Sequence, residues 1–297
     1  MHGRARAPAA GTVLNALANL KGSAFAIGVY TTATVELTAS ADETGESDVT
    51  GTVAGVPDAD TTLIERCVSV VTDRFGDGEG GTVRTESDVP MAAGLKSSSA
   101  AANATVLATL DALDAVDAIS REEAARIGVE AAREAGVTVT GAFDDASASM
   151  LGGVTVTDNE RDELLAREEP AWDVLVWTPP EQAYSADADV EACRQIAPIA
   201  DLVVDLALAG EYERAMSVNG LAFCAALGFS PDPMVEAMPD AAGVSLSGTG
   251  PSFTAVGERD ALEAVRARWD DRPGTTMLTR TQTEGAQLVE CRRYDVP

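Results

Sequence analysis

Histidine is almost missing from this sequence, and its absence narrows the chemistry that the chain can perform. The single copy, His2, lies at the N-terminus, where we expect the chain to fray. Catalysis by a Ser/His pair and metal sites built from several histidines are therefore nearly excluded, and general base work falls to carboxylates. No apolar run reaches the roughly 18 residues of a membrane span, and no signal-like apolar segment follows the N-terminus, so we expect a cytoplasmic protein.

Closely spaced cysteines are missing as well. The four cysteines, Cys67, Cys193, Cys224 and Cys291, stand far apart and form no CxxC motif. This spacing argues against a zinc ribbon or a redox dithiol. We expect these side chains to be buried as small apolar groups.

Lysine is the third scarce residue. Only Lys21 and Lys96 occur among 21 basic residues, against 48 acidic ones, and the net charge is −27. A surface this negative repels nucleic acids and anionic lipids, so we expect neither as a partner. Excess acid with few lysines favours a protein adapted to high salt, where charges are screened. An acidic scaffold for a basic partner is the alternative interpretation.

The length of 297 residues and the apolar fraction of 45% allow a sizeable core, in one large domain or two joined ones. In the first half we predict strands at 24–37 and 82–88, a hairpin within 40–60, and helices at 61–75, 97–113 and 120–134. In the second half we predict strands at 154–157, 173–177, 244–246, 252–256 and 275–281, with helices dominating 187–238 and another at 260–269. Runs of strands followed by runs of helices indicate an α+β fold. We expect two packed halves, residues 1–155 and 156–297.

The segment PMAAGLKSSSA, residues 90–100, joins a predicted strand to a predicted helix. Free N–H groups and the positive end of a helix dipole make such a junction a site for phosphate. Gly94 lets the backbone approach an anion closely, Lys96 adds a charge, and serine hydroxyls can bind magnesium. A helix start with a serine cap is the simpler interpretation, but three serines beside a rare lysine favour phosphate binding. No glycine precedes the lysine, which disfavours a Walker-type fold.

Two adjacent carboxylates, Asp144 and Asp145, follow the 120–134 helix in the segment TVTGAFDDAS, residues 138–147. Neighbouring side chains point in different directions, so at most one of the two faces a given substrate. Either could cap a helix that starts at Ala146. Either could equally be a general base or a metal ligand, because a chain without usable histidine must use carboxylates. The segment alone leaves both roles open.

A third segment, GVSLSGTGPS at residues 243–252, is a strand that enters a Gly-x-Gly-Pro turn and is followed by another strand. By itself this pattern is most often only a tight turn. Its weight as part of a site comes from its combination with the two segments above.

Together these segments resemble the GHMP kinases, the family of galacto-, homoserine, mevalonate and phosphomevalonate kinases. The family's phosphate loop reads Pro-x-x-x-Gly-Leu-Gly-Ser-Ser-Ala, and residues 90–100 match it with Lys96 in place of the third-position glycine and one extra serine. Residues 247–252 are similar to the family's glycine-rich motif, and residues 11–16, 21–25, 94–99 and 140–145 narrow the resemblance to the archaeal type of shikimate kinase. The resemblance covers essentially the whole chain. It implies an N-terminal ribosomal-protein-S5-like α/β half packed on a C-terminal ferredoxin-like α+β half.

The activity that the resemblance implies is transfer of the γ-phosphoryl group of ATP to the 3-hydroxyl of shikimate, a step toward chorismate and the aromatic amino acids, with Mg²⁺ as cofactor. The implied residues of the ATP site are Pro90, Met91, Ala92, Ala93, Gly94, Leu95, Lys96, Ser97, Ser98, Ser99 and Ala100. The implied residues beside the transferring phosphate and the acceptor are Asn15, Ser23, Ser247, Gly248, Thr249 and Gly250.

The resemblance also implies a catalytic base. The family's catalytic aspartate precedes a Gly-Gly pair by seven and eight residues, and Asp145 has this spacing to residues 152 and 153, so Asp145 is favoured over Asp144. Many family members carry a lysine in an N-terminal Ala-Pro-Gly-Lys motif, which residues 7–10 lack. Lys21 is then the candidate either for binding the shikimate carboxylate or for lowering the pKa of the attacking hydroxyl.

For the metal, the family's Gly-Ser-Ser implies Ser98 as a magnesium ligand, with Glu130 of the following helix as its acidic partner. Glu134 is the alternative acid, because the spacing from Glu130 to the next glycine differs by one residue from the family's. A homoserine kinase, another GHMP kinase and a non-catalytic ligand-sensing relative are the alternative functions. We expect a monomer or a homodimer.

Overall fold

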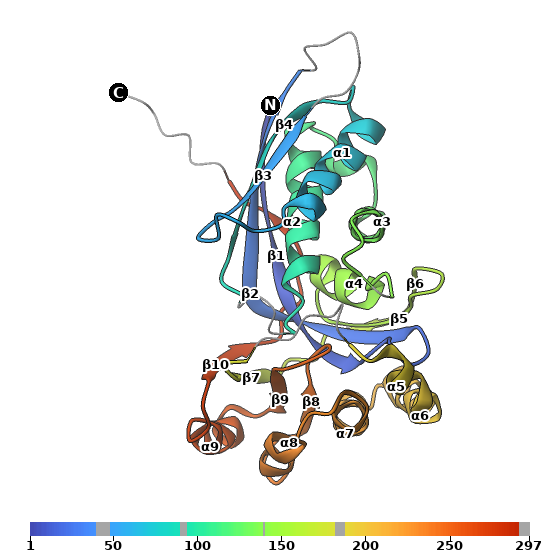
Figure 1. Cartoon of the computed structure of the whole chain (residues 1–297), viewed down its shortest axis with the longest axis vertical. Coiled ribbons are helices and arrows are strands. Elements are labelled where there is room, and N and C mark those ends of the chain that lie inside the picture. Colours follow the sequence, from blue (N-terminus) through green and yellow to red (C-terminus); the bar gives the residue numbers. More distant parts are fainter. Residues whose placement is uncertain (40–47, 90–93, 139, 182–187, 291–297) are drawn as a thin grey trace.

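Two β-sheets, each covered by helices, make up the computed structural model of the protein, which describes residues 1–39, 48–89, 94–138, 140–181 and 188–290 (Figure 1). The first sheet is built on a long antiparallel hairpin of β1 (His2–Leu14) and β2 (Lys21–Thr38). Its strand order is β11-β1-β2-β4-β3, and β5 and β6 extend the sheet from the beginning of β2. The other strands are β3 (Val49–Val53), β4 (Gly80–Ser87), β5 (Val154–Asp158), β6 (Glu163–Glu168) and β11 (Gln287–Leu288).

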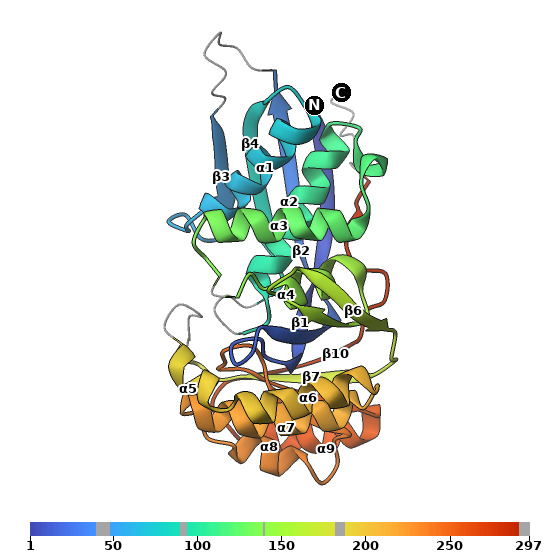
Figure 2. The ribbon, with the colours of Figure 1, turned by 90° about the vertical axis from the view of Figure 1, so that its right-hand side faces the viewer.

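Four helices lie over one face of the first sheet (Figures 1 and 2). They are α1 (Thr62–Phe75), α2 (Ser97–Ala112), α3 (Arg121–Glu134) and α4 (Phe143–Leu151), with a short 3₁₀ turn, η1 (Val116–Ala118), between α2 and α3. The alanine-rich α2 is buried over most of its length. It also lies very close to β1, because a Cβ added at Gly3 would stand 2.0 Å from the carbonyl oxygen of Ala108. Small residues on both elements therefore place α2 directly against the hairpin.

The second sheet has the order β10-β7-β9-β8, and all of its pairs are antiparallel. Its strands are β7 (Asp173–Thr178), β8 (Gly243–Leu246), β9 (Phe253–Gly257) and β10 (Thr275–Arg280). Its helices are α5 (Val190–Gln195), α6 (Ala197–Leu208), α7 (Tyr212–Leu227), α8 (Asp232–Ala237) and α9 (Arg259–Trp269). These helices lie on the side of the sheet away from α1 to α4 (Figures 1 and 2). A fourth-first-third-second strand order with this chain connection is the ferredoxin-like arrangement.

The far end of the β1–β2 hairpin connects the two halves. Val13, Leu14, Phe25 and Ile27 are fully buried in one apolar cluster that also contains residues of β7, β8, β9 and α7. Burial of such side chains contributes roughly 1.5–3 kcal/mol each. The turn that joins β1 to β2 therefore lies at the junction of the halves.

Most of the predicted elements are confirmed. The predicted helices of the first half are α1, α2 and α3, and Ser120 caps α3 by accepting a hydrogen bond from the Glu123 amide at 3.1 Å. The predicted strands are β2, β4, β5 and β7 to β10, whereas β1, β6 and β11 were not predicted. Strand β5, which contains residue 155, strand β6, which follows it, and the late strand β11 all pair within the first sheet.

Two local predictions are wrong. The 40–60 region does not form a hairpin in its described part, because β3 pairs in parallel with β4; residues 40–47 lie outside the described residues. The N-terminus does not fray at His2, since β1 begins there and the Met1 carbonyl accepts a hydrogen bond from the Leu37 amide at 2.8 Å. Long-range pairing decides both cases, and it leaves little local signal in a sequence as rich in alanine, glycine and arginine as residues 2–14.

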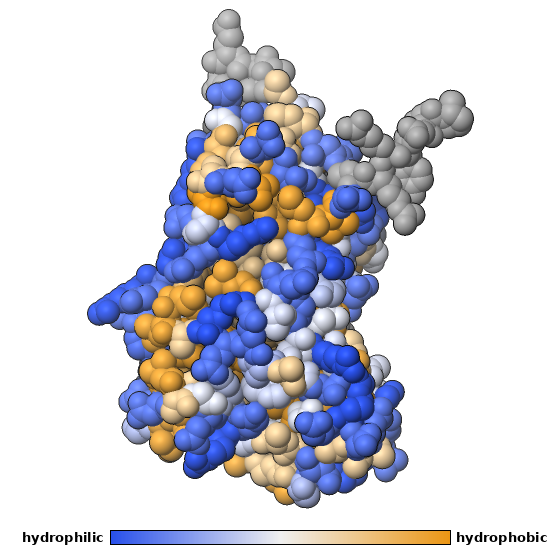
Figure 3. Space-filling model, turned by 180° about the vertical axis from the view of Figure 1, so that it is seen from behind, coloured by the Kyte–Doolittle hydropathy of each residue, from blue (hydrophilic) through white to orange (hydrophobic). Residues whose placement is uncertain are grey.

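Polar residues cover much of the outer surface. Figure 3 shows a largely hydrophilic face with apolar patches between the polar side chains. As predicted, Cys67, Cys193 and Cys224 are buried and free; Cys291 lies outside the described residues. Within the described ranges, no helix is long and apolar enough to span a membrane.

Candidate active site

The predicted phosphate loop leads into the N-terminus of α2. Pro90, Met91, Ala92 and Ala93 lie outside the described residues, and Gly94, Leu95 and Lys96 form the described part before the helix. Lys96 is the N-cap, in the left-handed conformation at φ 62°, and its side chain makes no capping hydrogen bond. Ser98 is exposed in the first turn. Among the described residues, no side chain accepts a hydrogen bond from the first N–H groups of α2, which suits an anionic ligand.

Lys96 reaches the pair of aspartates at the start of α4. Its Nζ lies 2.8 Å from Oδ1 of Asp145 and donates a hydrogen bond to Oδ2 at 3.1 Å. Only 12% of the Lys96 side chain and 13% of the Asp145 side chain are exposed. Burial of the ammonium opposes its charge, but the nearby Asp145 and Asp144 carboxylates outweigh it and raise the pKa of Lys96. The lysine is therefore a cation that is held against Asp145.

Asp144 occupies a different environment from its neighbour. It is 3% exposed, and its Oδ1 accepts a hydrogen bond from Nδ2 of Asn159 at 2.7 Å. Gly22 of β2 stands directly behind it, since a Cβ added there would lie 2.4 Å from the Asp144 Cγ. Burial and the negative charge of Asp145 raise the pKa of Asp144 to about 7, although Lys96 and Asn159 act in the opposite direction. The structure thus gives different surroundings to two aspartates that the local segment alone could not tell apart.

The glycine-rich turn after β8 packs on the phosphate loop. The Ser247 hydroxyl donates a hydrogen bond to the Gly94 carbonyl at 2.8 Å, and a Cβ added at Gly94 would lie 2.3 Å from the Ser247 carbonyl oxygen. A Cβ added at Gly248 would lie 3.1 Å from Lys96 Nζ. Glycines at 94 and 248, both at positive φ, therefore allow the loop, the turn and the Lys96 ammonium to meet.

The β1–β2 hairpin supports this turn from the other side. Asn15 Nδ2 donates to the Gly248 carbonyl at 2.8 Å, and the Gly248 amide donates to the Thr12 hydroxyl at 2.8 Å. Ser23 lies in β2 with a fully buried side chain. Gly250 follows in the same turn, next to the Phe229 ring. Most of the described candidates from these segments thus meet in one cluster.

Lys21, Glu130 and Glu134 have other partners. Lys21 forms an ion pair with Asp158, its cross-strand neighbour on β5. Burial opposes the charge of Asp158, but the hydrogen bond from Lys21 and two backbone amides outweigh it and lower the pKa of Asp158. On α3, the carboxylates of Glu130 and Glu134 pair with arginines of α1, Arg74 and Arg66 respectively.

The described residues contain no group of three or more His, Cys, Asp or Glu side chains arranged to hold a metal ion. A magnesium ion that accompanies a nucleotide needs fewer protein ligands, because it keeps waters and binds phosphate oxygens. The exposed Ser98 hydroxyl fits such a site in type and position, at the uncapped helix end. Glu130 fits in chemical type, and its two oxygens are at present both bonded to Arg74.

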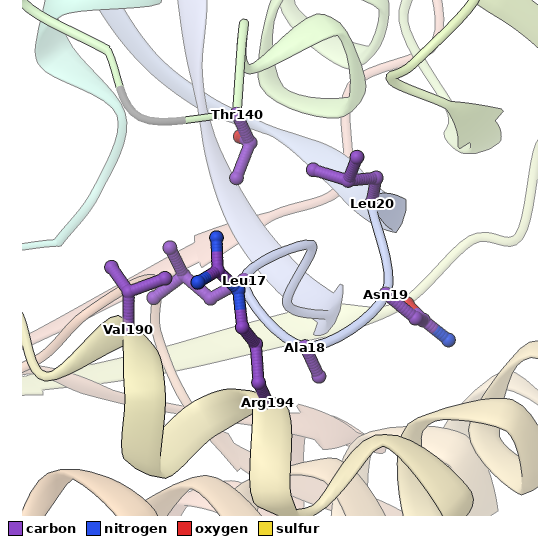
Figure 4. Close-up of a pocket in the computed structure, with 7 residues that line it drawn as sticks. All are labelled: Leu17, Ala18, Asn19, Leu20, Thr140, Val190 and Arg194. Carbon is purple, nitrogen blue, oxygen red and sulfur yellow. The ribbon is translucent and has the colours of Figure 1, made fainter.

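A pocket of about 280 Å³ opens beside this cluster, between the β1–β2 turn and α5. Figure 4 shows Leu17 and Val190 beside Arg194, whose side chain extends from α5 into the pocket, with Thr140 and Leu20 across from the guanidinium group. The lining residues are Leu17, Ala18, Asn19, Leu20, Thr140, Val190 and Arg194. Sequence reasoning did not single out Arg194, because a lone arginine in a helical region carries no motif.

Other residues of the cluster were also missed. Asn159 accepts hydrogen bonds from the Asp144 amide at 3.1 Å and the Thr157 hydroxyl at 2.7 Å, in addition to its contact with the Asp144 carboxylate. Thr12 and Gly22 belong to the same group. The only available signal for Asn159 was its place directly after a predicted strand.

The sequence matches known proteins over part or all of its length. Residues 62–153 match the family model of the GHMP kinases N terminal domain. A shikimate kinase of Halobacterium salinarum is 63% identical over 289 residues, which cover 97% of this chain and 100% of that protein. A shikimate kinase of Methanosarcina mazei is 48% identical over 289 residues, 96% of each chain.

Solved structures share the fold at low sequence identity. A homoserine kinase from Cytophaga hutchinsonii superposes with a TM-score of 0.74 at 18% identity and covers 97% of both chains. The Methanococcus jannaschii mevalonate kinase superposes with a TM-score of 0.72 at 14% identity, over 95% of this chain and 99% of that one. At these identities the likeness establishes a common fold and carries no information on substrate.

Proposed function

Because the chain belongs to the archaeal shikimate kinases of the GHMP kinase family, we propose that its active site is the cluster around the Lys96–Asp145 ion pair, where ATP phosphorylates the 3-hydroxyl of shikimate. The single observation that carries this proposal is the position of that pair. It joins the N-terminus of α2, which suits phosphate, to the start of α4, which supplies a carboxylate. The membership and the shared fold confirm the predicted GHMP kinase architecture.

The loop and the turn bind the triphosphate in this proposal. Phosphoryl transfer depends mainly on positioning and on neutralising charge, with little covalent work for the protein. Uncapped N–H groups of α2 supply the partial positive charge. The contact between Ser247 and Gly94 keeps the glycine-rich turn beside the loop, so that residues from both halves surround the transferring group.

Asp145 serves as the general base. A base must reach the acceptor hydroxyl and be ionised when it does so. Asp145 meets both requirements better than Asp144, because Lys96 holds it at the loop, whereas Asp144 is enclosed by Asn159 and Gly22 and has a raised pKa. We assign Lys96 to positioning of Asp145. The ion pair of Lys21 with Asp158 supports a role for Lys21 in joining β2 to β5.

Magnesium is the proposed cofactor, with Ser98 and Glu130 as its protein ligands and with Glu134 as the alternative acid. When bound, the ion neutralises charge on the phosphates. Glu130 must leave Arg74 to take part. We further propose that the protein works in the cytoplasm at high salt, which accords with the charge of −27.

A comparison of acceptors tests the function. Release of ADP is followed in molar potassium chloride with shikimate, homoserine and mevalonate as separate acceptors. We expect turnover with shikimate and at most a trace with the other two, in agreement with the names of the relatives. Turnover only with homoserine or mevalonate would contradict the substrate, and no turnover with any acceptor would favour a ligand-sensing relative.

A further inference from the structure

We propose that Arg194 binds the carboxylate of the acceptor in the pocket between the β1–β2 turn and α5, and so selects an acid as substrate. The inference rests on the proposed function, since it assigns a residue to the recognition of shikimate. No motif in the sequence marks this arginine; its charge, its location and the residues that line the pocket with it support the role.

Arg194 is more available to an anionic ligand than either lysine. An anionic acceptor approaching a protein of charge −27 needs a local positive group. Both lysines have close carboxylate partners, Lys96 with Asp145 and Lys21 with Asp158. Among the described residues, Arg194 has only a loose pairing, at 3.7 Å with Glu191, and 66% of its side chain is exposed. Exposed pairs of this kind are weak, so the guanidinium group can exchange Glu191 for a ligand.

The described lining of the pocket is uncharged apart from Arg194. Among the seven described residues that line it, Arg194 is the only charged one, in a chain with 48 acidic residues. The guanidinium group extends into the pocket, on the side opposite Thr140 (Figure 4). Its planar fork of donors matches a carboxylate in a bidentate arrangement. One arginine and no carboxylate among the described lining residues suit a small organic acid.

Hydrogen bonds and close contacts join the pocket to the proposed base, Asp145. Leu17 lines the pocket, and its amide donates to the Asn15 side chain at 3.0 Å. Asn15 in turn donates to the Gly248 carbonyl, and Gly248 adjoins the Lys96 ammonium that holds Asp145. One wall of the pocket is therefore joined through a short chain of contacts to the Lys96–Asp145 pair.

Thr140, on the opposite wall of the pocket, is joined to the helix that carries Asp145. The Thr140 hydroxyl accepts a hydrogen bond from the Ala142 amide at 3.2 Å, directly before the helix that carries Asp145. Contacts from both walls of the pocket thus lead to the elements that carry the Lys96–Asp145 pair. Leu17, Leu20 and Val190 supply apolar surface for the carbon ring. The volume of about 280 Å³ is near the lower limit of small-molecule sites, roughly 300–1,000 Å³.

The experiment compares shikimate with its uncharged methyl ester as acceptors for the full-length protein and for Arg194→Met. We expect the substitution to raise the KM for shikimate about thirty- to a hundredfold, because a charge-assisted hydrogen-bonded pair is lost. The KM for the methyl ester, the KM for ATP and kcat at saturating shikimate should each change less than about threefold. The reason is that Arg194 binds the carboxylate equally well in the ground state and in the transition state, so its loss weakens substrate binding without slowing the chemical step. Arg194→Lys keeps the charge but lacks the planar pair of N–H donors, so its KM for shikimate should lie between that of the unaltered protein and that of Arg194→Met.

Arg214→Met is the matched control, since Arg214 also forms an exposed ion pair with a glutamate three residues away. Arg214→Met should leave the KM for shikimate and the KM for its methyl ester unchanged at the same salt concentration. An unchanged KM for shikimate in Arg194→Met, or an equal rise for shikimate and its ester, would overturn the assignment of Arg194. Failure of the unaltered protein to phosphorylate shikimate would instead overturn the proposed function.

Discussion

Asparagine in place of Asp145 lowers kcat with shikimate at least about a hundredfold, the contribution expected of a positioned general base. The amide keeps the size of the side chain and one oxygen near Lys96, but it cannot accept the proton of the acceptor hydroxyl. The measurement is steady-state turnover in molar potassium chloride, with both substrates saturating. A shikimate-independent readout, binding of an ATP analogue, should be nearly unchanged.

Asp144→Asn is the matched variant, because it removes the adjacent carboxylate of the same helix. We expect a clearly smaller loss of kcat, since Asp144 is enclosed by Asn159 and Gly22 and an amide oxygen can still accept the Asn159 hydrogen bond. The reverse order, with Asp144→Asn the more damaging change, would show that the base has been assigned to the wrong aspartate.

Methionine in place of Lys96 should have the second large effect. It removes the cation that orients Asp145, and we expect kcat to fall about tenfold to a hundredfold, the scale of a misplaced catalytic group. The KM for ATP should rise much less. Removing Lys96 also removes an influence that keeps the pKa of Asp144 down, so this pKa rises further. Because the carboxylates of Asp144 and Asp145 interact and lose protons as a pair, the acid limb of the kcat profile moves to higher pH.

Two further variants separate positioning from a general loss of stability. Lys96→Arg keeps the charge, so the acid limb should stay near that of the unaltered protein and part of kcat should return. Arg272→Met removes a cation from the ion pair with Glu236, far along the chain in the second half, and should change neither kcat nor its pH profile. If Lys96→Met raised the KM for ATP while kcat and the profile stayed constant, Lys96 would be a phosphate ligand and not a positioning residue.

The sequence predicted which segments form the candidate site, but not which side chains of these segments contact one another. The loop at 94–100, the aspartates at 144 and 145 and the turn at 247–250 were identified from local patterns, and the structure brings them together. Lys21 was a candidate for the site because residues 7–10 lack the family's lysine, and strand register places it opposite Asp158. Register over a separation this long leaves no mark in the sequence near Lys21.

Asp144 and Asp145 illustrate the same limit. Adjacent identical residues have nearly identical local surroundings, and the resemblance alone favoured Asp145 through its spacing to residues 152 and 153. Gly22 and Asn159 come from β2 and from the position directly after β5, so the enclosure of Asp144 depends on two distant segments. The same holds for β1, whose small residues form a strand because α2 and β2 pack on them.

The scarcity of lysine is now easier to interpret. A strongly acidic chain must still bind two anions, and we place the positive groups for this at three local points. The α2 N-terminus receives phosphate, Lys96 holds the base, and Arg194 faces the acceptor pocket. General acidity of the surface is therefore compatible with a site for anions, provided that each anion meets its own cation or N–H group.

The most direct test of the account is the structure of the product, determined by ¹H–³¹P correlation NMR after the protein has consumed ATP and shikimate. If the carboxylate lies at Arg194 and the acceptor hydroxyl at Asp145, the phosphorus should couple to the proton on C3 of the ring and to no other ring proton. Coupling to the proton on C4 or C5, or the absence of any phosphorylated shikimate, would contradict the account.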